Sequence, residues 1–124
     1  EPVSLARKMP FEAVMRMALT GGNERMTAQR AYELGMVSEV VPAAELMARA
    51  VALADLIKVN SPVALARSKK ALWEAKEMGL HKALNNAWGY IMDQNKHQDI
   101  AEGGEAFMER RDPEWKPYAG ECDE

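Results

Sequence analysis

The sequence predicts a mainly α-helical chain, with about six helices and one short strand near residues 37–41. Residue types that favour helix, among them alanine, leucine, methionine, glutamate, lysine and arginine, dominate the 124 positions. Within each long segment apolar residues recur at steps of three and four, the spacing of one helix face. Glycine and proline fall between these segments and interrupt them. Together these observations indicate short amphipathic helices joined by tight turns.

Two short helices are expected before the strand. The first runs from about Pro10 to Leu19, and the sequence Thr-Gly-Gly-Asn at 20–23 interrupts its apolar pattern. The second begins after Thr27, whose hydroxyl can accept a hydrogen bond from a free N–H group of the first turn. Gly35 stands where a helix commonly ends in the left-handed conformation, so this helix has barely two turns.

The segment 37–41 contains three valines and is the single candidate strand, although it is too short to stand alone. It therefore needs a partner strand, or it is an extended connector. Pro42 suits the first position of a longer helix, because the N–H group that proline lacks has no partner there in any case. One apolar stripe of this helix comprises Leu46, Ala50, Leu53 and Ile57.

A restart signal separates the third predicted helix from the fourth. Asn60 ends one helix, and Ser61 followed by Pro62 begins the next, because a serine hydroxyl caps the first turn and proline suits the first helical position. The fourth helix continues to about Met78, and the fifth begins at once with Leu80.

The sixth helix is expected to start near Asp99. Asp99 and Glu102 have the spacing of a capping box, in which each side chain accepts a hydrogen bond from the other residue's backbone N–H group. Pro113 ends the helix, since proline cannot continue it. Trp115 and Tyr118 then lie in an irregular tail.

Composition argues against several classes of protein. The net charge is −3 and the basic residues form no block, so a nucleic-acid partner is not expected. Cys122 is the single cysteine, which rules out an intrachain disulfide and favours a reducing, cytoplasmic location. No apolar run approaches the ~20 residues of a membrane span, and no basic-then-apolar leader opens the chain. His81 and His97 lie outside any metal-ligand spacing, so no metal site is expected.

The apolar faces exceed what one small core can bury. A chain of this length supports a single core, yet every long predicted helix carries an apolar stripe. We therefore expect some of these surfaces to lie against something beyond this chain.

Two stretches carry a resemblance to a known family. The first is LTGGNERMTAQRAYELGMVSEVVP at 19–42, and the second is DIAEGGEAFMERRDPEW at 99–115. They are similar to the crotonase family of enoyl-CoA hydratases and isomerases. In that family L-T-G precedes a short A-x-x-A helix, then G-L-V and a valine-rich strand, and E-G-x-x-A-F-x-E-K-R followed by an aromatic lies near the end.

A third, shorter likeness lies between the two stretches. The sequence Asn-Ser-Pro at 60–62, followed by Ala64, Lys69 and Lys70, resembles the family's N-x-P-x-A helix with its lysine. The resemblance runs from about residue 5 to residue 115. It implies that this chain is the C-terminal helical region of a larger crotonase-like α/β β-spiral fold.

The resemblance implies an enoyl-CoA hydratase, a lyase of fatty acid metabolism. In the family, backbone N–H groups of the preceding β-spiral domain stabilise the enolate of an acyl-CoA thioester, and two glutamates of that domain activate the water that adds to a 2-enoyl-CoA. No residue here matches either glutamate. Glu1 falls just after the second glutamate's usual loop, and we interpret it as a solvated chain end rather than a general base. We expect the catalytic residues to be missing from this chain, which alone should be inactive.

The resemblance places one substrate contact in this chain. In many members an aromatic and a basic residue of the last helix reach the adenine and phosphate of CoA held largely by a neighbouring subunit, and the matching positions are Phe107 and Arg110. Arginine replaces the usual lysine, still suits phosphate, and adds bidentate geometry. Without the family register, Phe107 fits a core aromatic equally well and Arg110 a solvated charged face. An acyl-CoA thioester is the expected substrate, and no separate cofactor is expected.

The expected organisation has three parts. Residues 1–41 are the end of the spiral core region, residues 42–118 a helical oligomerisation domain, and residues 119–124 an acidic tail. The resemblance implies a homo-oligomer, a trimer or a dimer of trimers for the full enzyme. Two alternatives stay open, a catalytically empty helical oligomerisation module and another crotonase-family reaction such as isomerisation or acyl-CoA hydrolysis. An unrelated helical adaptor would require both matched stretches to be chance.

Overall fold

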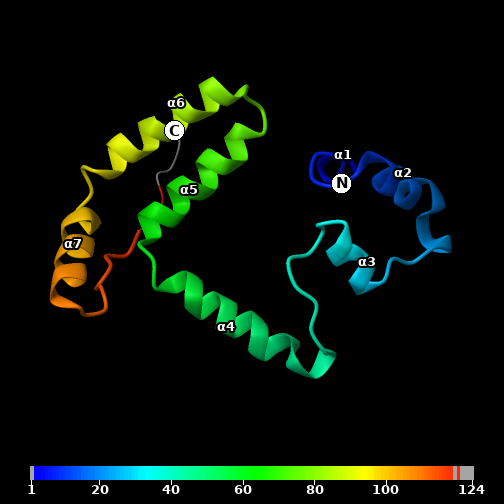
Figure 1. The fold of residues 1–124 in the computed structure, drawn as a ribbon, viewed down its shortest axis with the longest axis horizontal. Helices are drawn as coiled ribbons and strands as arrows, with labels where there is room; N and C mark the ends of the chain where they lie inside the picture. Colours follow the sequence, from blue (N-terminus) through cyan, green and yellow to red (C-terminus); the bar gives the residue numbers. More distant parts are fainter. Residues whose placement is uncertain (1, 119, 121–124) are drawn as a thin grey trace. The chain divides into compact units, whose positions relative to one another are not determined.

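The computed structural model describes residues 2–118 and 120, and it consists of α-helices joined by turns (Figure 1). The prediction of a mainly helical chain is confirmed. Two 3₁₀ segments, η1 (Gly21–Asn23) and η2 (Ala43–Glu45), accompany the helices. The helices are α1 (Pro2–Leu5), α2 (Phe11–Thr20), α3 (Ala28–Glu33), α4 (Leu46–Lys58), α5 (Pro62–Ala75), α6 (Leu80–Gln94) and α7 (Asp99–Glu109).

The predicted strand at 37–41 is wrong, because the backbone there is irregular and no strand occurs in residues 2–118. A strand needs a neighbouring strand to pair its backbone N–H and C=O groups, and the described residues offer none. The segment is instead an extended connector. It is tied to the start of α4 by Arg49, whose Nε donates to the Glu39 carboxylate at 2.7 Å.

The chain divides into two compact units, Glu1–Arg49 and Ala50–Glu124. In the first unit α1 packs against α2, and the side chains of Met9, Val14 and Ala31 are buried. In the second unit α5 and α6 pack side by side (Figure 1). Its buried apolar residues include Val63 and Ala106. The domain boundary expected after residue 41 stays a prediction.

Local signals position α3 as predicted. The Thr27 hydroxyl accepts a hydrogen bond from the Arg30 N–H at 3.1 Å and caps the first turn. Gly35, just after the helix, has a φ of +72°, a conformation that strains any residue with a Cβ. Pro42, in contrast, does not occupy the first position of α4. It precedes the 3₁₀ segment η2, which leads into the helix.

The restart before α5 is also confirmed. Pro62 is the first residue of the helix, and the Ser61 hydroxyl accepts a hydrogen bond from the Ala64 N–H at 3.3 Å. Further along, the carboxylate of Glu74 reaches α6 and accepts a hydrogen bond from the Tyr90 hydroxyl at 2.9 Å. Desolvation, together with this carboxylate, raises the pKa of Tyr90. A polar contact therefore joins α5 and α6 where they lie side by side.

The apolar side chains of α4 are unusually exposed. No residue of this helix is buried, and the side chains of Met47 and Leu56 are 72% and 61% exposed. A helix with apolar residues on most of its circumference is normally covered by protein. The excess of apolar surface expected from the sequence is thus present. Other large apolar side chains that the described residues leave exposed include Leu80, Leu84, Trp88, Phe107 and Met108.

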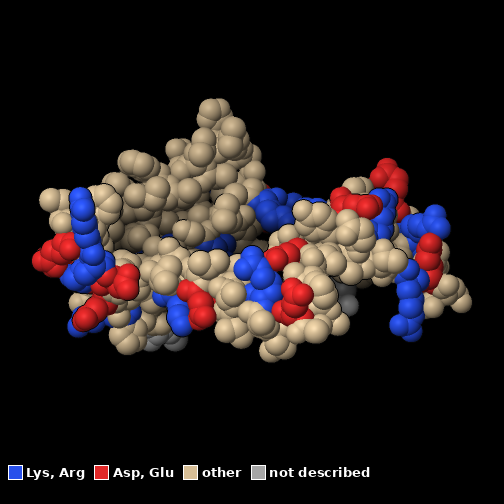
Figure 2. Space-filling model, turned by 60° about the horizontal axis from the view of Figure 1, so that its bottom comes forward, with Lys and Arg blue, Asp and Glu red and all other residues tan. Residues whose placement is uncertain are grey.

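Charged side chains of both signs lie next to one another on the face shown in Figure 2, and no area of a single charge covers it. This mixture is consistent with the sequence, which has no block of basic residues. Among the residues that the structure describes, no helix is both long and apolar enough to cross a lipid bilayer.

Candidate functional site

The two predicted CoA-contact residues lie at the C-terminal end of α7. Phe107 belongs to the last turn and Arg110 is the residue that caps it. Arg110 has a φ of 55°, in the left-handed region that residues other than glycine adopt rarely. The backbone N–H of Arg111 then donates to the Ala106 carbonyl at 3.1 Å and closes the helix. The chain therefore reverses direction beside Arg110.

Both predicted residues present their side chains at the surface. Phe107 is 82% exposed, so within the described residues it is not the core aromatic that helical spacing alone also allowed. Its neighbour Met108 is 81% exposed. The Arg110 side chain is exposed too, and no carboxylate of the described part of the chain forms an ion pair with it. An exposed aromatic ring and an available guanidinium suit a ligand with a planar ring and a phosphate.

The neighbouring Arg111 differs from Arg110 because its guanidinium is paired with two carboxylates. Arg111 Nη1 donates to the Glu102 carboxylate at 2.6 Å, and its Nε donates to Glu109 at 2.6 Å. These two carboxylates raise the pKa of Arg111. Of the two consecutive arginines, only Arg110 is therefore free to meet an anionic ligand without breaking an ion pair seen in the structure.

Glu102 fastens the irregular tail to α7. Its carboxylate accepts hydrogen bonds from the Arg111 guanidinium and from the backbone N–H of Glu114, at 2.6 Å in each case. These contacts lower the pKa of Glu102 from 4.5 to about 2, the Arg111 hydrogen bond contributing most. The predicted capping box with Asp99 is wrong, because this carboxylate is engaged by the tail. The N-cap of α7 is Gln98, without a side-chain hydrogen bond.

The other member of the predicted capping box is used in a different contact. Asp99 is only 4% exposed, and its Oδ2 accepts a hydrogen bond from the Ser61 hydroxyl at 2.5 Å. The second oxygen, Oδ1, is buried without a hydrogen-bond partner and lies 3.4 Å from His97 Nδ1. That nitrogen accepts the Asp99 backbone N–H at 3.2 Å. Ser61 and Asp99 stand 38 positions apart, so sequence spacing could not pair them.

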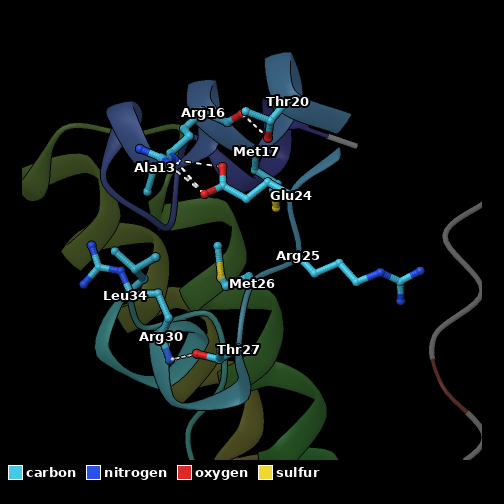
Figure 3. A pocket seen from close by; sticks show the side chains of 10 residues that line it. All are labelled: Ala13, Arg16, Met17, Thr20, Glu24, Arg25, Met26, Thr27, Arg30 and Leu34. Carbon is cyan, nitrogen blue, oxygen red and sulfur yellow. Dashed lines mark hydrogen bonds and ion pairs between the residues drawn. The ribbon is translucent and has the colours of Figure 1, made fainter. Parts of the chain in front are cut away.

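A pocket of ≈ 400 Å³ lies in the first unit, between α2 and α3 (Figure 3). Arg16 forms a paired contact with Glu24 at its edge, with Nε–Oε2 at 2.8 Å and Nη2–Oε1 at 2.7 Å. This pairing raises the pKa of Arg16 and lowers that of Glu24. Arg25 points away from the other lining side chains in Figure 3. The pocket is lined by Ala13, Arg16, Met17, Thr20, Glu24, Arg25, Met26, Thr27, Arg30 and Leu34.

The described residues bring one acidic side chain, Glu24, to the pocket. Its one acidic group is neutralised by Arg16, and the remaining lining is largely apolar or cationic. Within residues 2–118 and 120, no three His, Cys, Asp or Glu side chains gather in a way that could hold a metal ion. Glu1 and Cys122 lie outside the described residues, as does most of the segment 119–124.

Comparison with known sequences shows a continuous match. A profile of the enoyl-CoA hydratase/isomerase family matches residues 3–118. The carnitinyl-CoA dehydratase of Proteus mirabilis (strain HI4320) is 34% identical over 116 residues, covering 90% of this chain and 44% of that protein. The carnitinyl-CoA dehydratase of Salmonella typhimurium is 33% identical over 119 residues, with the same coverage. The chain thus spans less than half the length of these relatives.

Solved structures of enoyl-CoA hydratases also match this chain. A crystal structure of an enoyl-CoA hydratase/isomerase from Mycobacterium paratuberculosis matches with a TM-score of 0.87 and 40% identity, covering 94% of this chain and 46% of that one. The enoyl-CoA hydratase from Bacillus anthracis matches with a TM-score of 0.83 and 31% identity, covering 90% and 43%. The helical arrangement described above is therefore found as part of longer chains.

Proposed function

Because the chain belongs to the enoyl-CoA hydratase/isomerase family, we propose that it is the C-terminal helical part of an enzyme that adds water to, or removes it from, an acyl-CoA thioester. The observation that carries this proposal is the family match over residues 3–118. The names of the relatives support it, since carnitinyl-CoA dehydratase and enoyl-CoA hydratase both describe water leaving or joining a CoA thioester. We assign no catalytic residue to this chain.

The contribution of this chain is to hold the substrate by its CoA moiety. Phe107 supplies an aromatic face for the adenine, and Arg110 supplies donors for a phosphate. The exposure of both side chains and the absence of an ion pair on Arg110 within the described residues support this role. Binding energy from a part of the substrate remote from the reacting bond can be used to orient that bond. We propose that the reaction uses no separate cofactor beyond the CoA carried by the substrate.

The experiment is a steady-state assay of the complete gene product with crotonyl-CoA and with carnitinyl-CoA. Turnover is followed by the ultraviolet absorbance of the conjugated enoyl thioester, and products are identified by mass. Hydration of crotonyl-CoA adds the mass of one water and dehydration of carnitinyl-CoA removes it, whereas isomerisation leaves the mass unchanged and hydrolysis releases free CoA. A complete product that transforms neither thioester would contradict the proposed function.

The site assignment is tested with Arg110→Ala, and Arg25→Ala serves as the matched control. Loss of a charge-assisted contact to phosphate should raise KM about 10-fold with kcat within about twofold. Arg25, an exposed arginine of the first unit, should leave both parameters unchanged. An unchanged KM in Arg110→Ala would refute the CoA contact while leaving the reaction class intact.

A second candidate function, subunit association through the helices, is favoured by one observation. No residue of α4 is buried in the described chain, although the helix is rich in apolar side chains. We propose that such faces are covered in a homo-oligomer, a trimer or a dimer of trimers. Sedimentation of the complete gene product should show that mass, and Leu56→Ser should lower it, whereas the polar neighbour change Lys58→Ser should not. A monomeric complete product would contradict this candidate.

A further inference from the structure

The start of α7 and the tail that follows the helix both contact the short connection between α4 and α5. At the start of α7, the Asp99 carboxylate accepts the Ser61 hydroxyl hydrogen bond at 2.5 Å. Beyond its end, Trp115 Nε1 donates to the Val59 carbonyl at 2.8 Å, across 56 positions of sequence. Residues 59–61, which we name the elbow, therefore receive one contact from the first residue of α7 and one from the tail.

The Ser61–Asp99 contact is buried and cannot be explained as a helix cap of α7. Asp99 is 4% exposed and Ser61 is 8% exposed. Ser61 already caps α5 by accepting the Ala64 N–H, and its hydroxyl proton remains to donate to Asp99. Burying a carboxylate costs free energy unless hydrogen bonds compensate for the lost water. Unlike an apolar contact, a hydrogen bond fixes both the distance and the direction between its two groups.

The tail packs against the same helix. A Cβ atom at Gly103 would lie 3.3 Å from the Trp115 ring, so the indole packs directly on the α7 backbone. Glu102, one position earlier, holds Arg111 and the Glu114 N–H. Contacts at Glu102 and Gly103 therefore hold the tail, as far as Trp115, against α7.

We propose that Ser61 and Asp99 are positioning residues for the CoA-contact end of α7; this inference rests on the function proposed above. Phe107 follows Asp99 by eight positions, about 12 Å along the helix axis. A tilt of about 10° at the base would move the far end by about 2 Å, more than a hydrogen bond to phosphate tolerates. The buried contact at the base therefore controls substrate affinity at the exposed end, without touching the substrate.

The test compares variants of the complete gene product by KM and kcat for the CoA thioester, and by the Kd for free CoA. Asp99→Ala and Ser61→Ala should raise KM and Kd about 3- to 10-fold, with kcat within about twofold. Ser61→Thr keeps both the cap and the donor, and it should restore values near those of the parent. Ser68→Ala, an exposed serine of the same helix, is the matched control and should change nothing.

A double-mutant cycle separates positioning from general damage. In a Phe107→Ala, Arg110→Ala background, adding Asp99→Ala should produce no further rise in KM, because the groups that it positions are absent. Additive effects, or a fall in kcat with KM unchanged, would overturn the positioning role. Amide hydrogen exchange across α6 identifies any variant that has unfolded, and the Ser61→Ala and Ser61→Thr pair then decides the question.

The two proposals fail in different ways. If Phe107→Ala and Arg110→Ala raise KM but Asp99→Ala and Ser61→Ala do not, the positioning role is refuted and the CoA contact stands. If Phe107→Ala and Arg110→Ala leave KM and Kd unchanged, the CoA contact is refuted and the positioning role falls with it.

Discussion

Within each of the two units of the chain, a different kind of polar contact joins the elements. In the unit Glu1–Arg49 the ion pairs join residues close in sequence, such as Arg16 with Glu24 and Arg30 with Glu33, and their side chains are exposed. In the unit Ala50–Glu124 the buried contact between Ser61 and Asp99 joins residues 38 positions apart. Exposed local pairs contribute little to stability, whereas a buried contact costs much when it is broken. The second unit should therefore be the more sensitive to single polar substitutions.

The largest effect is expected for Ser61→Ala. The change removes the cap of α5 and leaves the buried Asp99 carboxylate without its hydrogen-bond donor. We expect a loss of about 3 kcal/mol in the free energy of opening of α5 and α7, measured by amide hydrogen exchange on the complete gene product. Ser68→Ala provides the baseline. A loss no larger than that of an ordinary cap would show that Asp99 gains nothing from Ser61.

Thr27→Ala gives the ordinary cap for that comparison. The Thr27 hydroxyl accepts the Arg30 N–H at 3.1 Å, as Ser61 accepts the Ala64 N–H, but it has no buried acid to support. We expect about 1 kcal/mol of lost protection, confined to α3. Hydrogen exchange of the α3 amides measures it, with Thr27→Ser as the control that keeps the cap. An equal loss of protection in α5 would contradict the prediction that Thr27 stabilises α3 alone.

Acid should detach the tail from α7. The pKa of Glu102 is lowered from 4.5 to about 2, so the carboxylate stabilises the folded tail fully above about pH 4.5, and this contribution is lost as the pH falls through about 2. The indole N–H resonance of Trp115, followed by NMR between pH 5 and 2, reports the detachment. Glu102→Gln should abolish the pH-dependent step in this range. Identical titrations of the parent and the variant would exclude Glu102 as its source.

The smallest effect is expected for Arg16→Gln. Arg16 and Glu24 make a two-point contact, but their side chains are 72% and 41% exposed. Water and salt screen such a pair, so hydrogen exchange of α2 should change only slightly, and the difference should vanish at about 1 M salt. A loss of protection as large as that of Thr27→Ala would contradict this prediction, because it would mean that the ion pair stabilises α2 substantially. Glu12→Gln, which removes an exposed charge of the same helix, is the control.

Sequence patterns predicted the helices well where the deciding contact lies within one turn. Thr27, Gly35 and the Ser61–Pro62 pair all act on groups within a few positions, so their effect is visible in the sequence itself. The strand at 37–41 failed for the opposite reason. Valine-rich composition favours extended backbone, but a strand also requires a partner, and none is present in the described residues.

The candidate site shows the same limit at the level of side chains. The family register selected Phe107 and Arg110, and neither spacing nor composition would have separated them from a core aromatic and a solvated arginine. Exposure of Phe107 and the pairing of Arg111 rather than Arg110 became visible only in the folded chain. The spacing of Asp99 and Glu102 indicated a capping box, yet both carboxylates serve more distant partners.

The sequence by itself therefore determined the helical character of this chain, the ends of α3 and the start of α5, and the family to which it is similar. Only the tertiary structure decided which polar groups meet across the elbow, which arginine stays available, and which apolar faces remain uncovered. The physical reason is the distance along the sequence between the groups that interact. Caps and turns depend on neighbours within four positions, whereas the burial of Asp99 and the exposure of α4 depend on what the whole chain brings next to them.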